Sequence, residues 1–209
     1  MEYSALILFT IATSITPGPN NVMIMTSGVN HGFRKSIPHL AGIDLGFPLM
    51  LIVIGLGASQ IFETNPSLFL WLKIVGVVYL SYLAFKIASS PVQSFERSNS
   101  KPFTFFQAAL FQWVNPKAWI MCIGAVVTYV SSDQAYFQQL FAIALIFFVF
   151  GMPCTVAWLG FGSSLKQVLS KPSYLRIFNV SMALLLLVSL LPVFLELYES
   201  FNISMLHSG

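Results

Sequence analysis

Six apolar stretches, each long enough to cross a lipid bilayer, take up most of this 209-residue chain. We place them at about residues 3–28, 37–59, 67–87, 103–130, 136–163 and 174–195. A helix rises 1.5 Å per residue, so about 20 residues cross the roughly 30 Å of hydrocarbon in a bilayer. Only 8% of the residues are charged, against about 25% in a soluble domain. The sequence therefore predicts an all-α integral membrane protein with six transmembrane helices.

The same composition argues against several other classes of protein. With 10 basic and 7 acidic residues and a mean hydropathy of +0.80, the chain has too few charges to cover a soluble enzyme or to stay disordered. It also lacks the basic stripe of a nucleic-acid-binding protein. Cys122 and Cys154 lie in different apolar stretches, and no Cys/His spacing fits a metal site. We therefore expect no metal, no cofactor and no nucleic-acid partner.

The distribution of charge predicts the orientation of the helices. The first basic residue is Arg34, so the start of the chain lacks the basic region of a signal peptide and is interpreted as a first membrane helix. The first, third and fifth connections with their flanks hold eight basic residues: Arg34, Lys35, Lys86, Arg97, Lys101, Lys166, Lys171 and Arg176. The termini and the other two connections hold only acidic charges: Glu2, Glu63, Asp133, Glu196 and Glu199. Because basic connections stay in the cytoplasm, both termini are predicted to face the periplasm.

The two halves of the chain resemble each other. An offset of 105 residues takes 55–59 (GLGAS) onto 160–164 (GFGSS), and Pro48 onto Pro153. We divide a single transmembrane domain, 1–209, into repeat one (about 1–88), a linker (about 89–102) and repeat two (about 103–209). Since each repeat has three spans, an odd number, the repeats are predicted to be inverted relative to each other, a common plan in secondary transporters.

The first and fourth stretches each contain a helix breaker near their middle. The first holds Thr16-Pro17-Gly18-Pro19-Asn20-Asn21, and the fourth holds Asn115-Pro116-Lys117. A proline inside a helix removes an N–H donor and clashes with a carbonyl one turn earlier. Thr16 followed by Pro17, and Asn115 followed by Pro116, also fit an N-cap followed by a first helical residue. We predict that both helices are broken and that a second half-helix starts at each break.

Such breaks offer binding groups for both signs of charge. A helix N-terminus has free N–H donors and favours a carboxylate, whereas the freed carbonyls favour an ammonium group. The nine residues of the two breaks are therefore the candidate substrate-binding residues for a small zwitterion such as an amino acid. The alternative, that the prolines only kink the helices for packing, stays open, more so for the single proline of the second break.

Asp44 is the candidate proton carrier. A carboxylate within a membrane span needs a partner or takes up a proton; the alternative is a solvated carboxylate in a cytoplasmic vestibule. Lys117, in the fourth stretch, could pair with Asp44 or meet a substrate carboxylate. Gly42 and Gly46 flank Asp44 in a GxxxG pattern that we interpret as helix packing and that also permits a homodimer. His39, near the first connection, is expected to be solvated.

These motifs, taken together over nearly the whole chain, resemble the LysE/RhtB family of amino-acid exporters. The resemblance rests on 16–21 (TPGPNN), 31–34 (HGFR), Ala41-Gly42 with Gly46-Phe47, Gly76 with Tyr79-Leu80, and 115–117 (NPK). It implies a bacterial inner-membrane protein that exports small amino acids or related metabolites, driven by the proton gradient. The direction of transport and its energy source follow from the resemblance alone.

Two other functions are weighed against export. A membrane-embedded redox carrier would need paired cysteines near the surface, and a membrane hydrolase would need a nucleophile with a base; the chain shows neither pattern. An accessory subunit without transport of its own is compatible with every motif above.

Overall fold

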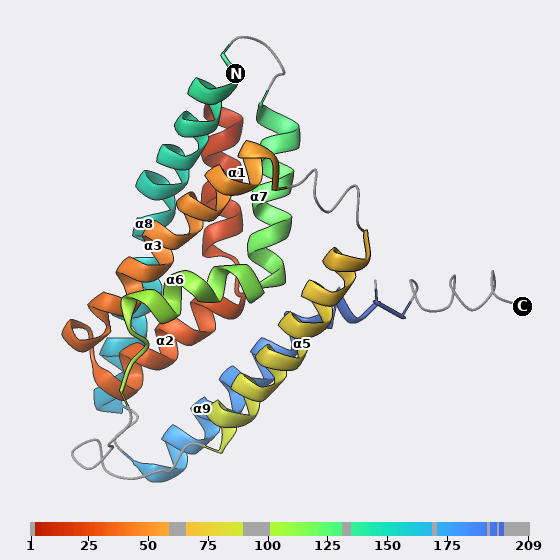
Figure 1. The fold of residues 1–209 in the computed structure, drawn as a ribbon. Helices are drawn as coiled ribbons and strands as arrows, with labels where there is room; N and C mark the ends of the chain where they lie inside the picture. Colours follow the sequence, from red (N-terminus) through yellow and green to blue (C-terminus); the bar gives the residue numbers. More distant parts are fainter. Residues whose placement is uncertain are drawn as a thin grey trace, which may run out of the picture.

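The computed structural model describes residues 3–58, 66–89, 101–130, 135–168, 171–191, 193–195 and 197–198. Within these ranges, all regular secondary structure is helical (Figure 1). The helices are α1 (Tyr3–Ile15), α2 (Pro19–His31), α3 (Ile37–Val53), α5 (Pro66–Ala88), α6 (Phe105–Val114), α7 (Pro116–Tyr129), α8 (Tyr136–Val168) and α9 (Pro172–Val188), with a 3-10 turn η1 (Arg34–Ser36) and a π-helical turn η2 (Ile54–Ala58). Most of the predicted linker, and the connections that hold Glu63 and Asp133, lie outside the described residues.

The breaks in the first and fourth apolar stretches are confirmed. α1 ends at Ile15 and α2 starts at Pro19, while Asn115 alone separates α6 from α7. Two helical segments in the described part of the chain are long and apolar enough to cross a membrane unaided, Arg34–Gly57 and Tyr136–Leu165. Shorter apolar segments lie in α1, α5, α6 and α9. For α1 and α6, the short length is a direct consequence of the breaks.

Two apolar cores hold the helices together. One lies between α2, α5, α6 and α9 and is centred on residues such as Val22, Leu80 and Leu186. The other lies between α1, α3, α7 and α8 and includes Leu6 and Met50. Figure 1 shows α5 and α9 side by side as a pair, and α1, α3, α7 and α8 gathered beside them.

Large apolar side chains also cover the outside of the protein. Phe106, Val127, Leu8 and Phe85 are all more than two-thirds exposed. So many exposed large apolar side chains are unusual in a soluble monomer. A lipid environment removes the cost of exposing them to water.

Glycines bring helix backbones into contact at two interfaces. On α3, a Cβ at Gly42 would lie 2.4 Å from the carbonyl oxygen of Phe105, and one at Gly46 would lie 2.7 Å from the Cα of Ala109. The GxxxG pattern therefore packs α3 against α6, as the sequence predicts. On α8, a Cβ at Gly162 would lie 2.2 Å from the Met25 carbonyl oxygen, so that α2 and α8 touch backbone to backbone.

The matched glycines of the two halves have different local structures. Gly57 lies in η2 with a φ of 122°, which favours glycine because it has no Cβ. Its counterpart, Gly162, lies inside the continuous helix α8. Pro48 and Pro153, by contrast, both lie inside helices, α3 and α8. The match between the halves therefore holds at the prolines but not at this pair of glycines.

Candidate substrate cavity

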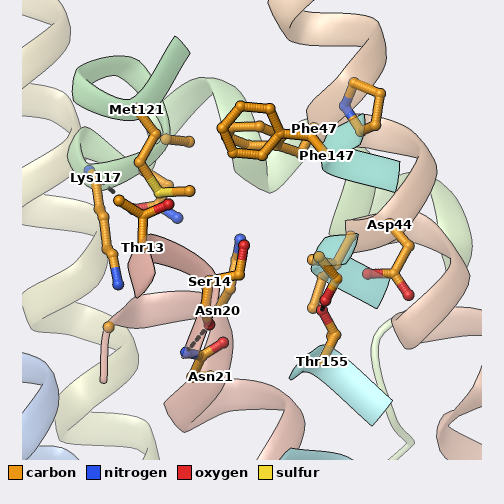
Figure 2. Close-up of a pocket in the computed structure, with 16 residues that line it drawn as sticks. Thr13, Ser14, Asn20, Asn21, Asp44, Phe47, Lys117, Met121, Phe147 and Thr155 are labelled. Atoms are coloured by element: carbon orange, nitrogen blue, oxygen red, sulfur yellow. Dashed lines mark hydrogen bonds between the residues drawn. The ribbon is translucent and has the colours of Figure 1, made fainter. Parts of the chain in front are cut away.

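Both helix breaks line one cavity in the middle of the helix bundle (Figure 2). Its walls come from α1, α2, α3, α7 and α8, and its polar and apolar lining includes Thr13, Ser14, Gly18, Asn20, Asn21, Asp44, Phe47, Asn115, Lys117, Met121, Phe147 and Thr155. Water-sized molecules can occupy about 60 Å³ of it. At about 10–15 Å³ for each water, this is room for a few waters or one small molecule.

At the first break, side chains satisfy the carbonyls that the end of α1 leaves free. The Asn21 Nδ2 donates to the carbonyl oxygens of Ser14 and Thr16, both at 2.8 Å. The Lys117 Nζ also donates to the Thr16 carbonyl oxygen, at 2.7 Å. The last turn of α1 is therefore held by an amide from α2 and an ammonium from α7.

The prediction that Thr16 caps α2 is wrong. The Thr16 hydroxyl donates back to the Ala12 carbonyl and so closes α1, while Gly18 is the N-cap and Pro19 the first residue of α2. A start at Pro17 would need a helical Gly18, and the residue before a proline avoids that conformation. Gly18 is instead fully extended, with φ −177° and ψ 179°.

The second break follows the prediction. Asn115 is the N-cap of α7, its Oδ1 accepts the Lys117 backbone N–H at 3.2 Å, and Pro116 comes first in the helix. The two helix starts differ, however, since no side chain caps α2. The first-turn amides of α2 are therefore the better place for a carboxylate.

A glutamine that the sequence analysis missed joins the two breaks. Gln112, on α6, has no exposed surface. The Asn20 Nδ2 donates to its Oε1 at 2.8 Å, and its Nε2 donates to the Asn20 Oδ1 at 3.2 Å and to the Ala108 carbonyl at 2.9 Å. This amide pair ties the start of α2 to the end of α6. The one feature of the sequence that could have indicated this role is the presence of an amide side chain, Gln112, in an apolar stretch three residues before Asn115.

Asp44 lies in the wall of the cavity. Its side chain is 8% exposed, and its Oδ2 has no hydrogen-bond partner in the described structure. Figure 2 shows Thr155 of α8 near its carboxyl group and Lys117 on the opposite side of the cavity. Lys117 is directed to the Thr16 carbonyl instead, and no ion pair joins these two described residues.

The structure brings together six of the ten residues that the sequence nominates. Gly18, Asn20, Asn21, Asn115, Lys117 and Asp44 line the cavity, whereas Thr16, Pro17, Pro19 and Pro116 do not line it. The latter four shape the breaks. The wall residues Phe47, Met121, Phe147 and Thr155 were missed, because nothing in the sequence indicates which helix faces which.

Two other polar residues lie outside the cavity. The expectation that His39 is solvated is wrong: it is 2% exposed, and its ring lies 5.2 Å from that of Phe103. Burial follows from the packing of the start of α3 on the segment before α6. Cys122 and Cys154 are both buried free thiols. Among the described residues, no cluster of three or more His, Cys, Asp or Glu could hold a metal.

Comparison with known proteins decides the family. Residues 11–193 match the LysE type translocators. The chain belongs to the LysE type translocator family. It is 31% identical over 194 residues to the cysteine/O-acetylserine efflux protein of Salmonella typhimurium, with 93% of this chain and 98% of the relative covered. It is 29% identical over 191 residues to the protein of that name from Escherichia coli K12, covering 91% and 96%. No solved structure matches the chain significantly.

Family membership fixes the class of the protein. LysE family members are transporters of the bacterial inner membrane with several helices, so this chain is a membrane transporter and not an enzyme. The redox and hydrolytic alternatives are therefore excluded. The same finer likeness to cysteine/O-acetylserine exporters is visible in the sequence itself, in 16–21 (TPGPNN), 31–36 (HGFRKS), 86–91 (KIASSP) and 101–102 (KP).

Proposed function

We propose that this LysE family protein exports small zwitterionic amino acids or related metabolites across the inner membrane, and that the cavity between the two breaks is its substrate site. The observation that carries the proposal is that one cavity collects groups for both charges of a zwitterion. The uncapped start of α2 favours the carboxylate. The Thr16 and Pro17 carbonyls, which Lys117 reaches from the cavity wall, favour the ammonium.

Cysteine and O-acetylserine are the first substrates to test. Two kinds of support exist: the names of the relatives that cover nearly the whole chain, and the size of the cavity, which suits a molecule of few atoms. Phe47, Phe147 and Met121 form an apolar part of the wall, and the Phe47 and Phe147 ring centroids are 4.9 Å apart. Such a wall suits a short apolar or sulfur-containing side chain.

We infer that transport uses two inverted three-helix repeats, with six spans, basic connections inside and both termini in the periplasm. The packing supports this arrangement. If the repeats are superposed, α1 corresponds to α6 and α3 corresponds to α8. The packing of α1 along α8 is then equivalent to that of α6 along α3, and the corresponding helices α5 and α9 pair with each other. α2 packs closely along α8 while its counterpart α7 meets α3 more loosely. Exchange of these two contacts would give alternating access to the cavity.

The energy source that we propose is the proton gradient, with Asp44 as the proton carrier. Its burial and its unpartnered Oδ2 support the role, since a buried carboxylate oxygen without a hydrogen-bond donor favours taking up a proton. Its place in the cavity wall would couple that proton to the substrate. The glycine-rich helix faces also permit a homodimer, although Gly42 and Gly46 already contact α6.

Counterflow in proteoliposomes tests the proposal. Vesicles with purified protein are loaded with one unlabelled amino acid at a time, and uptake of the labelled form is measured against protein-free vesicles. We expect counterflow for cysteine, O-acetylserine or another small neutral amino acid. Flux of none of them would refute the proposed function.

A further inference from the structure

The ammonium group of Lys117 occupies a place built for an amine. Its Nζ donates to the carbonyl oxygen of Thr16 at 2.7 Å and lies 3.4 Å from that of Pro17. Both carbonyls lie in the break directly after α1, whose C-terminal end adds partial negative charge. An ammonium has three donors and no acceptor, so a pair of carbonyls outside the helical hydrogen-bond ladder is a fitting receptor for it, although the Thr16 carbonyl also accepts the Asn21 amide. The α-ammonium of an amino acid has the same requirement.

Gly18 is what lets the lysine reach these carbonyls. Its extended backbone is open to any residue, so the glycine is not needed for conformation. A Cβ at Gly18 would lie 2.7 Å from the Cδ of Lys117 and 3.1 Å from its Nζ. The missing side chain at position 18 therefore leaves the room through which the lysine stem passes.

The lysine is held by contacts that a ligand can replace. Its ammonium donates to neutral backbone oxygens, which hold a cation less tightly than a carboxylate does. The stem is flexible and half-buried, and it lines the cavity itself. A lysine in this position can leave one acceptor set and swing to a carboxylate that enters the cavity.

We propose, on the basis of the proposed function, that Lys117 is an internal stand-in for the substrate's amino group. In the structure its ammonium occupies an amine subsite beside the cavity, formed by the Thr16 and Pro17 carbonyls. A zwitterion displaces it there with its own ammonium, and the released lysine pairs with the zwitterion's carboxylate. An amine alone leaves the lysine without a partner, and a carboxylate alone leaves the two carbonyls without an ammonium. The exchange therefore selects ligands that carry both charges.

Binding measurements on purified protein separate this role from simple capping of α1. The probes are cysteine, its decarboxylated analogue cysteamine and its deaminated analogue 3-mercaptopropionate, or the equivalent three compounds for the amino acid that counterflow identifies. The variants are Lys117→Met, which removes the charge at similar length, and Gly18→Ala, which displaces the lysine but keeps its charge. Gly124→Ala on α7 is the matched control, because a Cβ there meets nothing within 4 Å.

The two variants are expected to differ. In Lys117→Met, cysteamine binds more tightly than to wild type, while cysteine binds about ten- to a hundredfold more weakly, so that the preference for the zwitterion is lost. In Gly18→Ala, cysteine and cysteamine both bind more tightly than to wild type, and the preference for the zwitterion cysteine remains. Equal weakening of both compounds in Lys117→Met, or no gain for cysteamine in either variant, would overturn the inference.

Two further controls keep the test decisive. Should Lys117→Met fail to purify as a folded protein, Gly18→Ala alone decides whether displacement of the lysine frees an amine site. Wild-type protein that binds none of the amino acids in the counterflow panel would refute the proposed function and the inference together. Wild-type binding with unaltered selectivity in both variants would refute the inference alone.

Discussion

The contact between α2 and α8 leads to a prediction of defined size. An added Cβ at Gly162 would lie 2.2 Å from the carbonyl oxygen of Met25 and 2.9 Å from its carbonyl carbon. These are backbone atoms inside α2, so they cannot rotate away. Since non-bonded heavy atoms prefer about 3.5–4.0 Å, Gly162→Ala must move the two helices apart by roughly 1 Å.

Gly160→Ala is the matched control for this substitution. It lies two residues away on the same helix, and its Cβ would meet nothing within 4 Å. The gain in helix propensity from Gly to Ala, about 1 kcal/mol, is common to both variants and cancels in the comparison. The remaining difference is the cost of overpacking, about 1–3 kcal/mol.

Thermal unfolding in detergent measures this difference. At about 2–4 °C per kcal/mol for a chain of this size, Gly162→Ala should unfold roughly 2–12 °C below Gly160→Ala. Counterflow should fall in Gly162→Ala and persist in Gly160→Ala, because the α2–α8 contact is one of the two that alternate in the proposed cycle. Equal unfolding temperatures would refute the reasoning about the contact.

Three other predictions concern the cavity. Pro17→Ala combined with Pro19→Ala should abolish export while the protein still reaches the membrane, as checked by counterflow and membrane fractionation; normal export would remove the broken-helix argument. Asp44→Asn should uncouple transport from an imposed pH gradient, and an unchanged pH dependence would assign the proton site elsewhere. Gln112→Ala leaves the Asn20 amide without its buried partner and should cost about 1–3 kcal/mol of stability, measured by thermal unfolding; Gln138→Ala, at an exposed position near the start of α8, serves as the comparison, and equal losses would show that the amide pair contributes nothing.

Local chemistry explains what the sequence could predict. The breaks were predictable because a proline acts on its own helix, whatever surrounds it. The cap at Asn115 was predictable for the same reason. The start of α2 was misplaced by two residues because Thr16-Pro17 and Gly18-Pro19 both fit a cap followed by a proline. The two candidate starts differ only in that Pro19 disfavours a helical conformation at the residue before it, Gly18, and so rules out a start at Pro17.

Contacts between segments that are distant along the chain could not be predicted from the sequence. Thr155 and Phe147 face the cavity only because α8 crosses both α1 and α3. Gln112 acquires its role from Asn20, a residue 92 positions away. His39 is buried by packing against Phe103, which no feature near position 39 indicates. In each case the decisive neighbour is set by tertiary packing and not by spacing along the chain.

The central claim is that the two breaks form one substrate site. Ser14→Cys on α1 and Met121→Cys on α7, each made in a Cys122→Ser, Cys154→Ser background, place one reactive thiol in the cavity wall from either half. The measurement is the rate of maleimide labelling with and without a transported amino acid that has no thiol of its own, such as O-acetylserine. The account predicts that the substrate slows labelling at both positions, and protection at only one of them, or at neither, would contradict it.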